Sequence, residues 1–166
     1  LEGTKETDFV LVQNEVNHVS YIIERAKRKG LQVAFNAAPI NKGVENYPLN
    51  ELDFLFLNET EGEHLSGKKE TGEMIRILSK RLPETKLVIT LGGAGSIYHF
   101  KGETLQQAAI EVARIIDTTG AGDAFVGTFL AYFLQSERPQ EALMEAAKAS
   151  AKCISRKGAT NLLKNV

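Results

Sequence analysis

The sequence has only one cysteine, Cys153, among its 166 residues. A single thiol excludes a framework of internal disulfides and fits a reducing compartment. We interpret Cys153 as a core residue, because it lies on the apolar face of a predicted helix. No apolar run approaches the about 20 residues that a membrane-spanning helix needs, and no signal peptide is expected. The sequence therefore predicts a cytoplasmic protein, which in a eukaryote could also be nuclear.

The chain also has no large excess of positive or negative charge. The chain carries 20 lysines and arginines against 21 acidic residues, a formal net charge of −1. This balance leaves no basic surface for nucleic acid or an anionic membrane, so we expect neither as a partner. The densest basic run, 27–29, closes a predicted helix, where cations complement the helix dipole. The three histidines, His18, His64 and His99, are scattered without metal-ligand spacing, and we interpret each as solvated or packed.

Strand and helix patterns alternate along most of the chain. The predicted strands are 9–12, 31–35, 53–57, 87–91, 96–100 and 110–116. The predicted helices are 14–29, 58–67, 71–82, 122–135 and 139–154. This alternation indicates βαβ units and a mostly parallel sheet in one domain. Lys101-Gly102 is a turn signal between the last two strands, which predicts an antiparallel edge.

Polar residues or glycine follow the predicted strands. In such open sheets ligands bind beyond the carboxyl ends of the strands, so residues at these positions are candidates for one site. They are Glu15, Asn36, Asn58, Gly92 and Asp117.

The segment 117–125, DTTGAGDAF, carries the most specific chemistry. Gly120-Ala121-Gly122 has almost no side chain and precedes a long apolar helix. A ligand can therefore approach the main-chain N–H groups, and the helix dipole favours an anion there. Asp123 would repel a phosphate, but it suits a hydroxyl that attacks the phosphate and gives up its proton. The alternative is a glycine turn with a helix-capping aspartate.

Two further segments have both a functional and a purely structural interpretation. Asn58 and Glu61 have the spacing of a helix capping box, but they also share a helix face that can approach hydrated Mg²⁺. The glycine-rich segment 90–95 resembles a nucleotide-binding loop, or else a hairpin whose glycines supply positive φ. A dinucleotide fingerprint is disfavoured because a strand pattern, not a helix, follows the glycines.

These segments together resemble the ribokinase-like (PfkB) family of carbohydrate kinases. Segment 117–125 is similar to the family's carboxy-terminal signature, and Asn58–Glu61 matches its NxxE element. Segment 90–95 resembles its ATP loop, and 156–159 resembles its RKGA segment. Asn36–Pro39 resembles its NPAP turn, with alanine in place of the first proline.

The resemblance implies a role for each matching residue. Asp123 is the catalytic base and also touches the sugar, and Gly120, Ala121 and Gly122 form the anion hole. The ATP site is formed by Asn58, Thr90, Gly92, Gly95 and Gly122. Glu61 holds Mg²⁺ through water, and Glu15 faces the sugar. A monovalent cation, K⁺, is held around Asp117, Thr119, Arg156 and Gly158. From the residues alone, Glu15 can instead be a partner of a helix dipole, and Arg156–Gly158 a basic helix end.

The family's fold implies a three-layer α/β/α arrangement with a mostly parallel sheet and an antiparallel edge, incomplete at the amino-terminal side. We expect the chain to be the carboxy-terminal portion of such a kinase domain, without the lid and most of the sugar site, and with little activity alone. The implied reaction is transfer of the ATP γ-phosphoryl group to a pentose, D-ribose. The alternatives are a kinase for fructose, adenosine or a related substrate, and a nucleotide-binding module without catalysis. A homodimer through the missing lid region stays open.

Overall fold

The computed structural model describes residues 3–5, 8–41 and 43–158. The chain forms two units. The first contains the chain up to Ile89 together with His99–Thr104, and the second contains Thr90–Tyr98 together with the chain from Leu105 onward. The expectation of one domain stays a prediction. In the described part of the chain, no helix is both long and apolar enough to cross a membrane.

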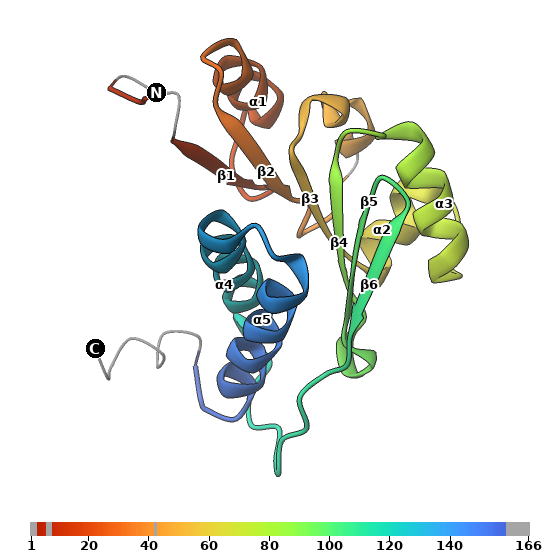
Figure 1. Ribbon diagram of the computed structural model, residues 1–166, viewed down its shortest axis with the longest axis vertical. Coiled ribbons are helices and arrows are strands. Elements are labelled where there is room, and N and C mark those ends of the chain that lie inside the picture. The colour runs from red at the N-terminus through yellow and green to blue at the C-terminus, as the bar shows by residue number, and fades with distance from the viewer. Residues whose placement is uncertain (1–2, 6–7, 42, 159–166) are drawn as a thin grey trace. The chain divides into compact units, whose positions relative to one another are not determined.

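The strands form a sheet of six in the order β1-β2-β3-β4-β5-β6 (Figure 1). Their bounds are β1 Phe9–Gln13, β2 Gln32–Asn36, β3 Phe54–Asn58, β4 Lys86–Thr90, β5 Ser96–Phe100 and β6 Glu103–Gln107. β1, β2 and β3 pair in parallel. The connections from β4 to β5 and from β5 to β6 are too short for a parallel crossover, so these strands form an antiparallel edge. The predicted α/β fold with a mostly parallel sheet is therefore confirmed.

Three helices belong to the first unit: α1 Val19–Arg28, α2 Glu59–Ser66 and α3 Thr71–Arg81. α1 contacts β1 and β2, and α2 contacts β3 and α3. The apolar residues of α1 recur at helical spacing, so Val19, Ile23 and Ala26 are all buried on one side of the helix. The predicted bounds of α2 and α3 agree with the structure to within one residue at the ends.

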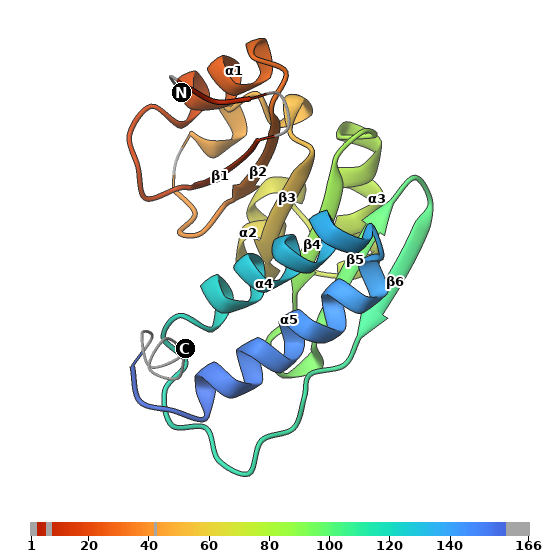
Figure 2. The same ribbon diagram turned by 60° about the vertical axis from the view of Figure 1, so that its left-hand side comes forward.

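The second unit is built on α4 Ala121–Ser136 and α5 Pro139–Ile154, which lie side by side (Figures 1 and 2). Phe125, Phe129 and Phe133 are four residues apart on α4 and stack with centroid separations of 6.4 and 5.8 Å. Tyr98 of β5 stacks on Phe129 at 6.3 Å. Burying each such ring stabilises the fold by about 1.5–3 kcal/mol. This aromatic column anchors the helix whose first turn carries Asp123.

The first helix begins later than predicted. α1 starts at Val19 rather than at Asn14, after His18 with a left-handed φ of 62°. Asn14 instead extends the edge of the sheet: its N–H donates to the carbonyl of Asn36 at 3.2 Å. The buried side chain of Asn14 also bonds to Pro39, which a helical position would not allow.

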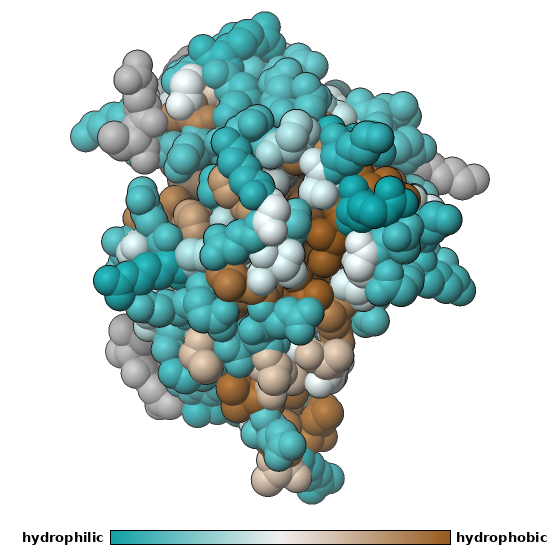
Figure 3. Space-filling view, turned by 45° about the vertical axis from the view of Figure 1, so that its right-hand side comes forward, coloured by the Kyte–Doolittle hydropathy of each residue, from teal (hydrophilic) through white to brown (hydrophobic). Residues whose placement is uncertain are grey.

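The predicted strand 110–116 is wrong. The antiparallel partner of β5 is β6, which begins directly after the Lys101-Gly102 turn. Residues 108–118 form a connection without regular secondary structure. The N–H groups of Ile116 and Asp117 donate to the carbonyl of Ile154 at the end of α5, not to a strand. Ile115 and Ile116 are more than half exposed. The face of the molecule in Figure 3 also has hydrophobic residues among hydrophilic ones at its surface. Alternation of apolar residues indicates an extended chain, but only a partner makes it a strand.

Candidate functional site

The turn before α4 has the geometry of an anion site. Gly120 is the N-cap residue, with a left-handed φ of 78°, and no side chain caps the helix. The N–H of Ala121 donates to the carbonyl of Thr118 at 3.2 Å. Among the described residues, no acceptor bonds to the N–H of Gly120 or Gly122. Asp123, in the same first turn, is exposed. The turn therefore presents two donors and a carboxylate close together in sequence at a helix N-terminus.

Asp117 ties this turn to the chain after α5. One carboxylate oxygen accepts from the N–H of Thr119 at 2.9 Å, and the other accepts from the N–H of Gly158 at 3.0 Å. The bond from Thr119 is the main reason why the pKa of Asp117 lies below its usual value, and Gly158 contributes. The structure thus brings together three of the four residues predicted for a monovalent cation.

The oxygen atoms around Asp117 are compatible with a bound monovalent cation. The Asp117 carboxylate and the Thr119 carbonyl are hard oxygen ligands, which alkali cations prefer. Arg156 contributes its main chain to the end of α5, where its N–H donates to the carbonyl of Cys153 at 3.2 Å. Ala159, the last residue of the RKGA resemblance, lies outside the described residues. Residues 3–5, 8–41 and 43–158 contain no group of three or more His, Cys, Asp or Glu side chains arranged to hold a metal.

Two side chains of α5 that the sequence did not single out for the site contact the turn. Ser150 Oγ donates to the carbonyl of Ala121 at 2.8 Å, and Cys153 Sγ donates to the carbonyl of Thr119 at 3.4 Å. Cys153 is buried, as predicted for a core residue. Burial, together with the charges of Asp117 and Asp123, raises the pKa of this thiol and keeps it protonated as a donor. Local patterns in the sequence do not signal these contacts, because the acceptors lie 29 and 34 positions away.

The glycine-rich loop Leu91–Gly95 belongs to the same unit as the turn. It closes on itself, with the N–H of Leu91 donating to the carbonyl of Gly95 at 2.8 Å. Gly95 has φ 103° and ψ −130°, and a Cβ there would lie 2.0 Å from the carbonyl oxygen of Gln107. Gly92 has φ 51° and open space around it. The hairpin, which was the alternative interpretation of this segment, therefore needs Gly95, while Gly92 is exposed and accessible to a ligand.

Asn58 and Glu61, in the first unit, form a complete capping box. The N–H and the side-chain amide of Asn58 donate to the two carboxylate oxygens of Glu61 at 2.7 and 2.8 Å. In return, the N–H of Glu61 donates to Asn58 Oδ1 at 3.0 Å. Since both oxygens of the buried Glu61 carboxylate are engaged, the predicted contact with Mg²⁺ through water fits this geometry better than direct coordination.

The pH dependence of stability should report this buried carboxylate. Burial raises the pKa of Glu61 above 4.5, and the bonds from Asn58 oppose this shift. Between pH 4.5 and the raised pKa of Glu61, the folded state binds more protons than the unfolded state. The free energy of unfolding therefore falls as pH rises through that window. We expect Glu61→Gln to remove this decline in urea titrations at several pH values, with Glu63→Gln as control. An unchanged pH profile in Glu61→Gln would contradict the assignment.

The turn after β2 and the start of the β1–α1 connection form a polar cluster in the first unit. Asn14 Nδ2 donates to the carbonyl of Pro39 at 2.6 Å, and Tyr47 OH donates to Asn14 Oδ1 at 3.1 Å. The buried Asn36 side chain accepts from the N–H of Ala38 at 3.3 Å. Glu15, which was predicted to face the sugar, follows Asn14 in the sequence, and its side chain is exposed. The bonds of Asn14 were not predicted, because Pro39 and Tyr47 lie 25 and 33 positions away in the sequence.

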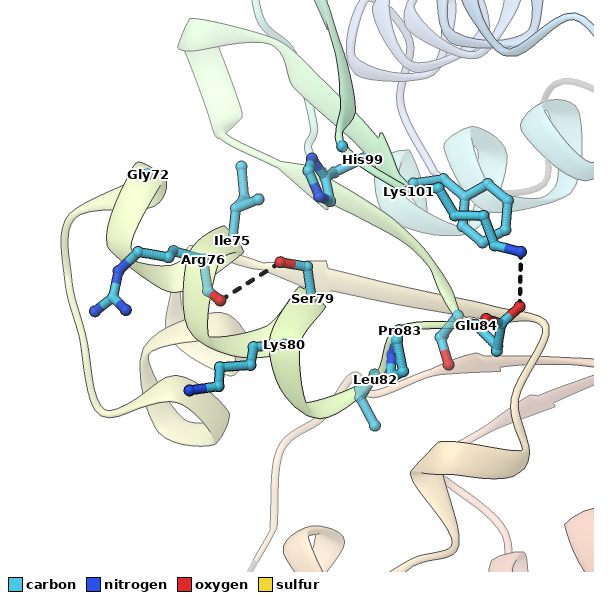
Figure 4. Close-up of a pocket in the computed structure, with 13 residues that line it drawn as sticks. Gly72, Ile75, Arg76, Ser79, Lys80, Leu82, Pro83, Glu84, His99 and Lys101 are labelled. Atoms are coloured by element: carbon cyan, nitrogen blue, oxygen red, sulfur yellow. Dashed lines mark hydrogen bonds and ion pairs between the residues drawn. The ribbon is translucent and has the colours of Figure 1, made fainter.

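A cavity of about 670 Å³ also lies in the first unit, between α3 and the β5–β6 turn (Figure 4). Ile75, Leu82 and His99 line it, and Lys101 pairs with Glu84 at 2.9 Å at its edge. None of the predicted site residues contributes to its wall. This cavity is therefore not part of the candidate phosphoryl-transfer site.

The family model for "pfkB family carbohydrate kinase" matches residues 6–165, nearly the whole chain. The chain belongs to the PfkB family of carbohydrate kinases. The resemblance seen in the sequence is thereby confirmed at the level of the family.

Among the curated relatives of this PfkB chain is a ribokinase of Arabidopsis thaliana, 32% identical over 166 residues, which covers 96% of this chain and 44% of the relative. A deoxyribokinase of Salmonella typhi is 31% identical over 163 residues, covering 95% of this chain and 53% of the relative. The chain thus spans about half the length of these relatives.

The solved structure of Arabidopsis thaliana ribokinase complexed with ribose and ATP superposes with a TM-score of 0.78 at 29% identity. The match covers 91% of this chain and 51% of that protein. The ribokinase-like fold is therefore confirmed for the PfkB chain described here.

Proposed function

We propose that the protein transfers the γ-phosphoryl group of ATP to the primary hydroxyl of a pentose, most simply D-ribose. The observation that carries this proposal is the first turn of α4. There the N–H groups of Gly120 and Gly122 lack partners among the described residues, and the exposed Asp123 follows directly. Such donors stabilise charge on a phosphoryl group in transfer, and a carboxylate accepts the proton of the attacking hydroxyl.

The cofactors follow from the same chemistry. ATP is the proposed phosphoryl donor, which the family and the ATP-bound ribokinase structure support. Mg²⁺ would neutralise the nucleotide phosphates, with Asn58 and Glu61 contacting its water shell. K⁺ would lie beside the turn, near the Asp117 carboxylate and the Thr119 carbonyl, and strengthen its positive potential. We further propose a cytoplasmic location, which the single cysteine supports.

Deoxyribose is the second candidate acceptor, since the deoxyribokinase relative matches almost as much of the chain at similar identity. The acceptor is tested by adding ribose, deoxyribose, fructose and adenosine in turn to the intact protein and measuring ADP release. We expect the highest kcat/KM with ribose. A higher value with deoxyribose would assign the second activity, and ATP binding without turnover on any acceptor would favour a regulatory nucleotide-binding module.

The 166-residue chain alone is expected to show little turnover, because a site that is open to water loses catalytic power.

A further inference from the structure

Two side chains from α5 hold the turn from the side of that helix. Ser150 and Cys153 are three residues apart, so they project from one face of α5. Ser150 donates to the carbonyl of Ala121 at 2.8 Å, and Cys153 donates to the carbonyl of Thr119 at 3.4 Å. Both acceptors belong to the turn that carries the amides of Gly120 and Gly122, for which the described part of the chain offers no acceptor.

Each of these carbonyls shares a peptide plane with one of the glycine donors. The carbonyl of Thr119 and the N–H of Gly120 form one peptide unit, and the carbonyl of Ala121 and the N–H of Gly122 form another. In a planar trans peptide the C=O and N–H bonds point in opposite directions. A bond that holds the carbonyl on the α5 side therefore turns the N–H away from α5.

The rest of the turn is fixed by main-chain bonds and by Asp117. The N–H of Thr119 donates to Asp117 at 2.9 Å, and the N–H of Ala124 donates to the carbonyl of Gly120 at 2.9 Å. The first turn of a helix otherwise frays easily, because its N–H groups have no acceptors within the helix. An anion hole, in contrast, needs donors that are already oriented before charge develops.

We propose that Ser150 and Cys153 are positioning residues, which hold two peptide planes so that the amides of Gly120 and Gly122 point at the transferring phosphoryl group. This inference rests on the proposed function of the turn. The bond from Ser150 should contribute more to this orientation than the bond from Cys153, because a hydroxyl is a stronger donor than a thiol. Cys153 acts on the peptide outside the helix, where no helical bond fixes the plane. Neither side chain touches substrate.

The test follows the amide resonances of Gly120 and Gly122 in ¹⁵N–¹H spectra of the full chain during titration with inorganic phosphate. In the unsubstituted protein, phosphate should shift both resonances. In Ser150→Ala, the phosphate affinity should fall about three- to tenfold, the range expected for one hydrogen bond. In Cys153→Ala the loss should be about two- to threefold, and Cys153→Ser, which keeps a donor, should bind phosphate as the unsubstituted protein does.

A kinetic measurement on the intact enzyme separates positioning from general destabilisation. We expect Ser150→Ala to lower kcat by a similar factor, with the KM for the sugar unchanged. Ser136→Ala is the matched control: its hydroxyl donates to the carbonyl of Tyr132 at 2.9 Å, at the far end of α4. It should leave phosphate binding and kcat unchanged.

The outcomes distinguish this inference from the proposed function. If phosphate shifts neither glycine in the unsubstituted protein, the anion hole itself is refuted, and the inference fails with it. If phosphate shifts both glycines equally in the unsubstituted protein and in Ser150→Ala and Cys153→Ala, only the positioning role is refuted. If Ser150→Ala does not fold, the comparison of Cys153→Ala with Cys153→Ser decides, and equal affinities in that pair overturn the inference.

Discussion

Replacement of Asp123 by asparagine is expected to lower kcat about 10²- to 10⁴-fold, the contribution typical of a positioned general base. The amide has nearly the shape of the carboxylate but cannot accept the proton of the attacking hydroxyl. Asp123 is exposed in the first turn of α4, so the substitution removes no core contact. It also removes a negative charge from an anion site, so the affinity for ATP should be unchanged or slightly higher.

The measurement combines steady-state ADP release by the intact protein with calorimetric titration of ATP. Glu111→Gln serves as control, since it removes another exposed carboxylate from the same unit, outside the segment 117–125. A kcat within a few-fold of the unsubstituted value in Asp123→Asn would refute the assignment of the base. A loss of ATP affinity equal to the loss of kcat would instead indicate a role of Asp123 in binding.

Local signals in the sequence were sufficient for most of the fold. The helix α2 was predicted from Asn58 and Gly67, and the structure has a complete capping box at the first and a left-handed φ of 69° at the second. Such caps involve residues three or four positions apart, so the sequence contains all the interacting groups. The same holds for the Gly120 turn, whose glycine adopts the positive φ that its position requires.

The errors occurred where the outcome depends on distant partners. Segment 110–116 alternates like a strand, but the place beside β5 is taken by β6. Asn14 was assigned to a helix, whereas Pro39 and Tyr47 hold it at the end of a strand. The contribution of Ser150 to the site was likewise not visible, because its acceptor lies 29 positions away on Ala121. In each case the deciding contact joins residues that local periodicity cannot relate.

The glycine-rich loop Leu91–Gly95 has a role in the fold and a proposed role in ATP binding, and a pair of substitutions should separate them. Gly95→Ala is expected to lower the free energy of unfolding by about 2–4 kcal/mol, since it combines a disfavoured φ with overlap against the main chain. The overlap is severe: the new Cβ would lie 2.0 Å from the Gln107 carbonyl oxygen and 2.8 Å from the Ala108 carbonyl carbon. Neither atom belongs to a side chain, so the β5–β6 hairpin itself must shift.

Gly92→Ala is the matched control for Gly95→Ala. Gly92 also has a positive φ, 51°, but a Cβ there meets no atom within 4 Å. Its cost should be about 1–2 kcal/mol, the ordinary penalty for a left-handed alanine. Urea unfolding of both variants measures the difference, and equal losses of stability would contradict the overlap at Gly95. Because Gly92→Ala leaves the hairpin intact, a lower ATP affinity in that variant would indicate contact between the loop and the nucleotide. Gly95→Ala cannot give this information, because it also disturbs the fold.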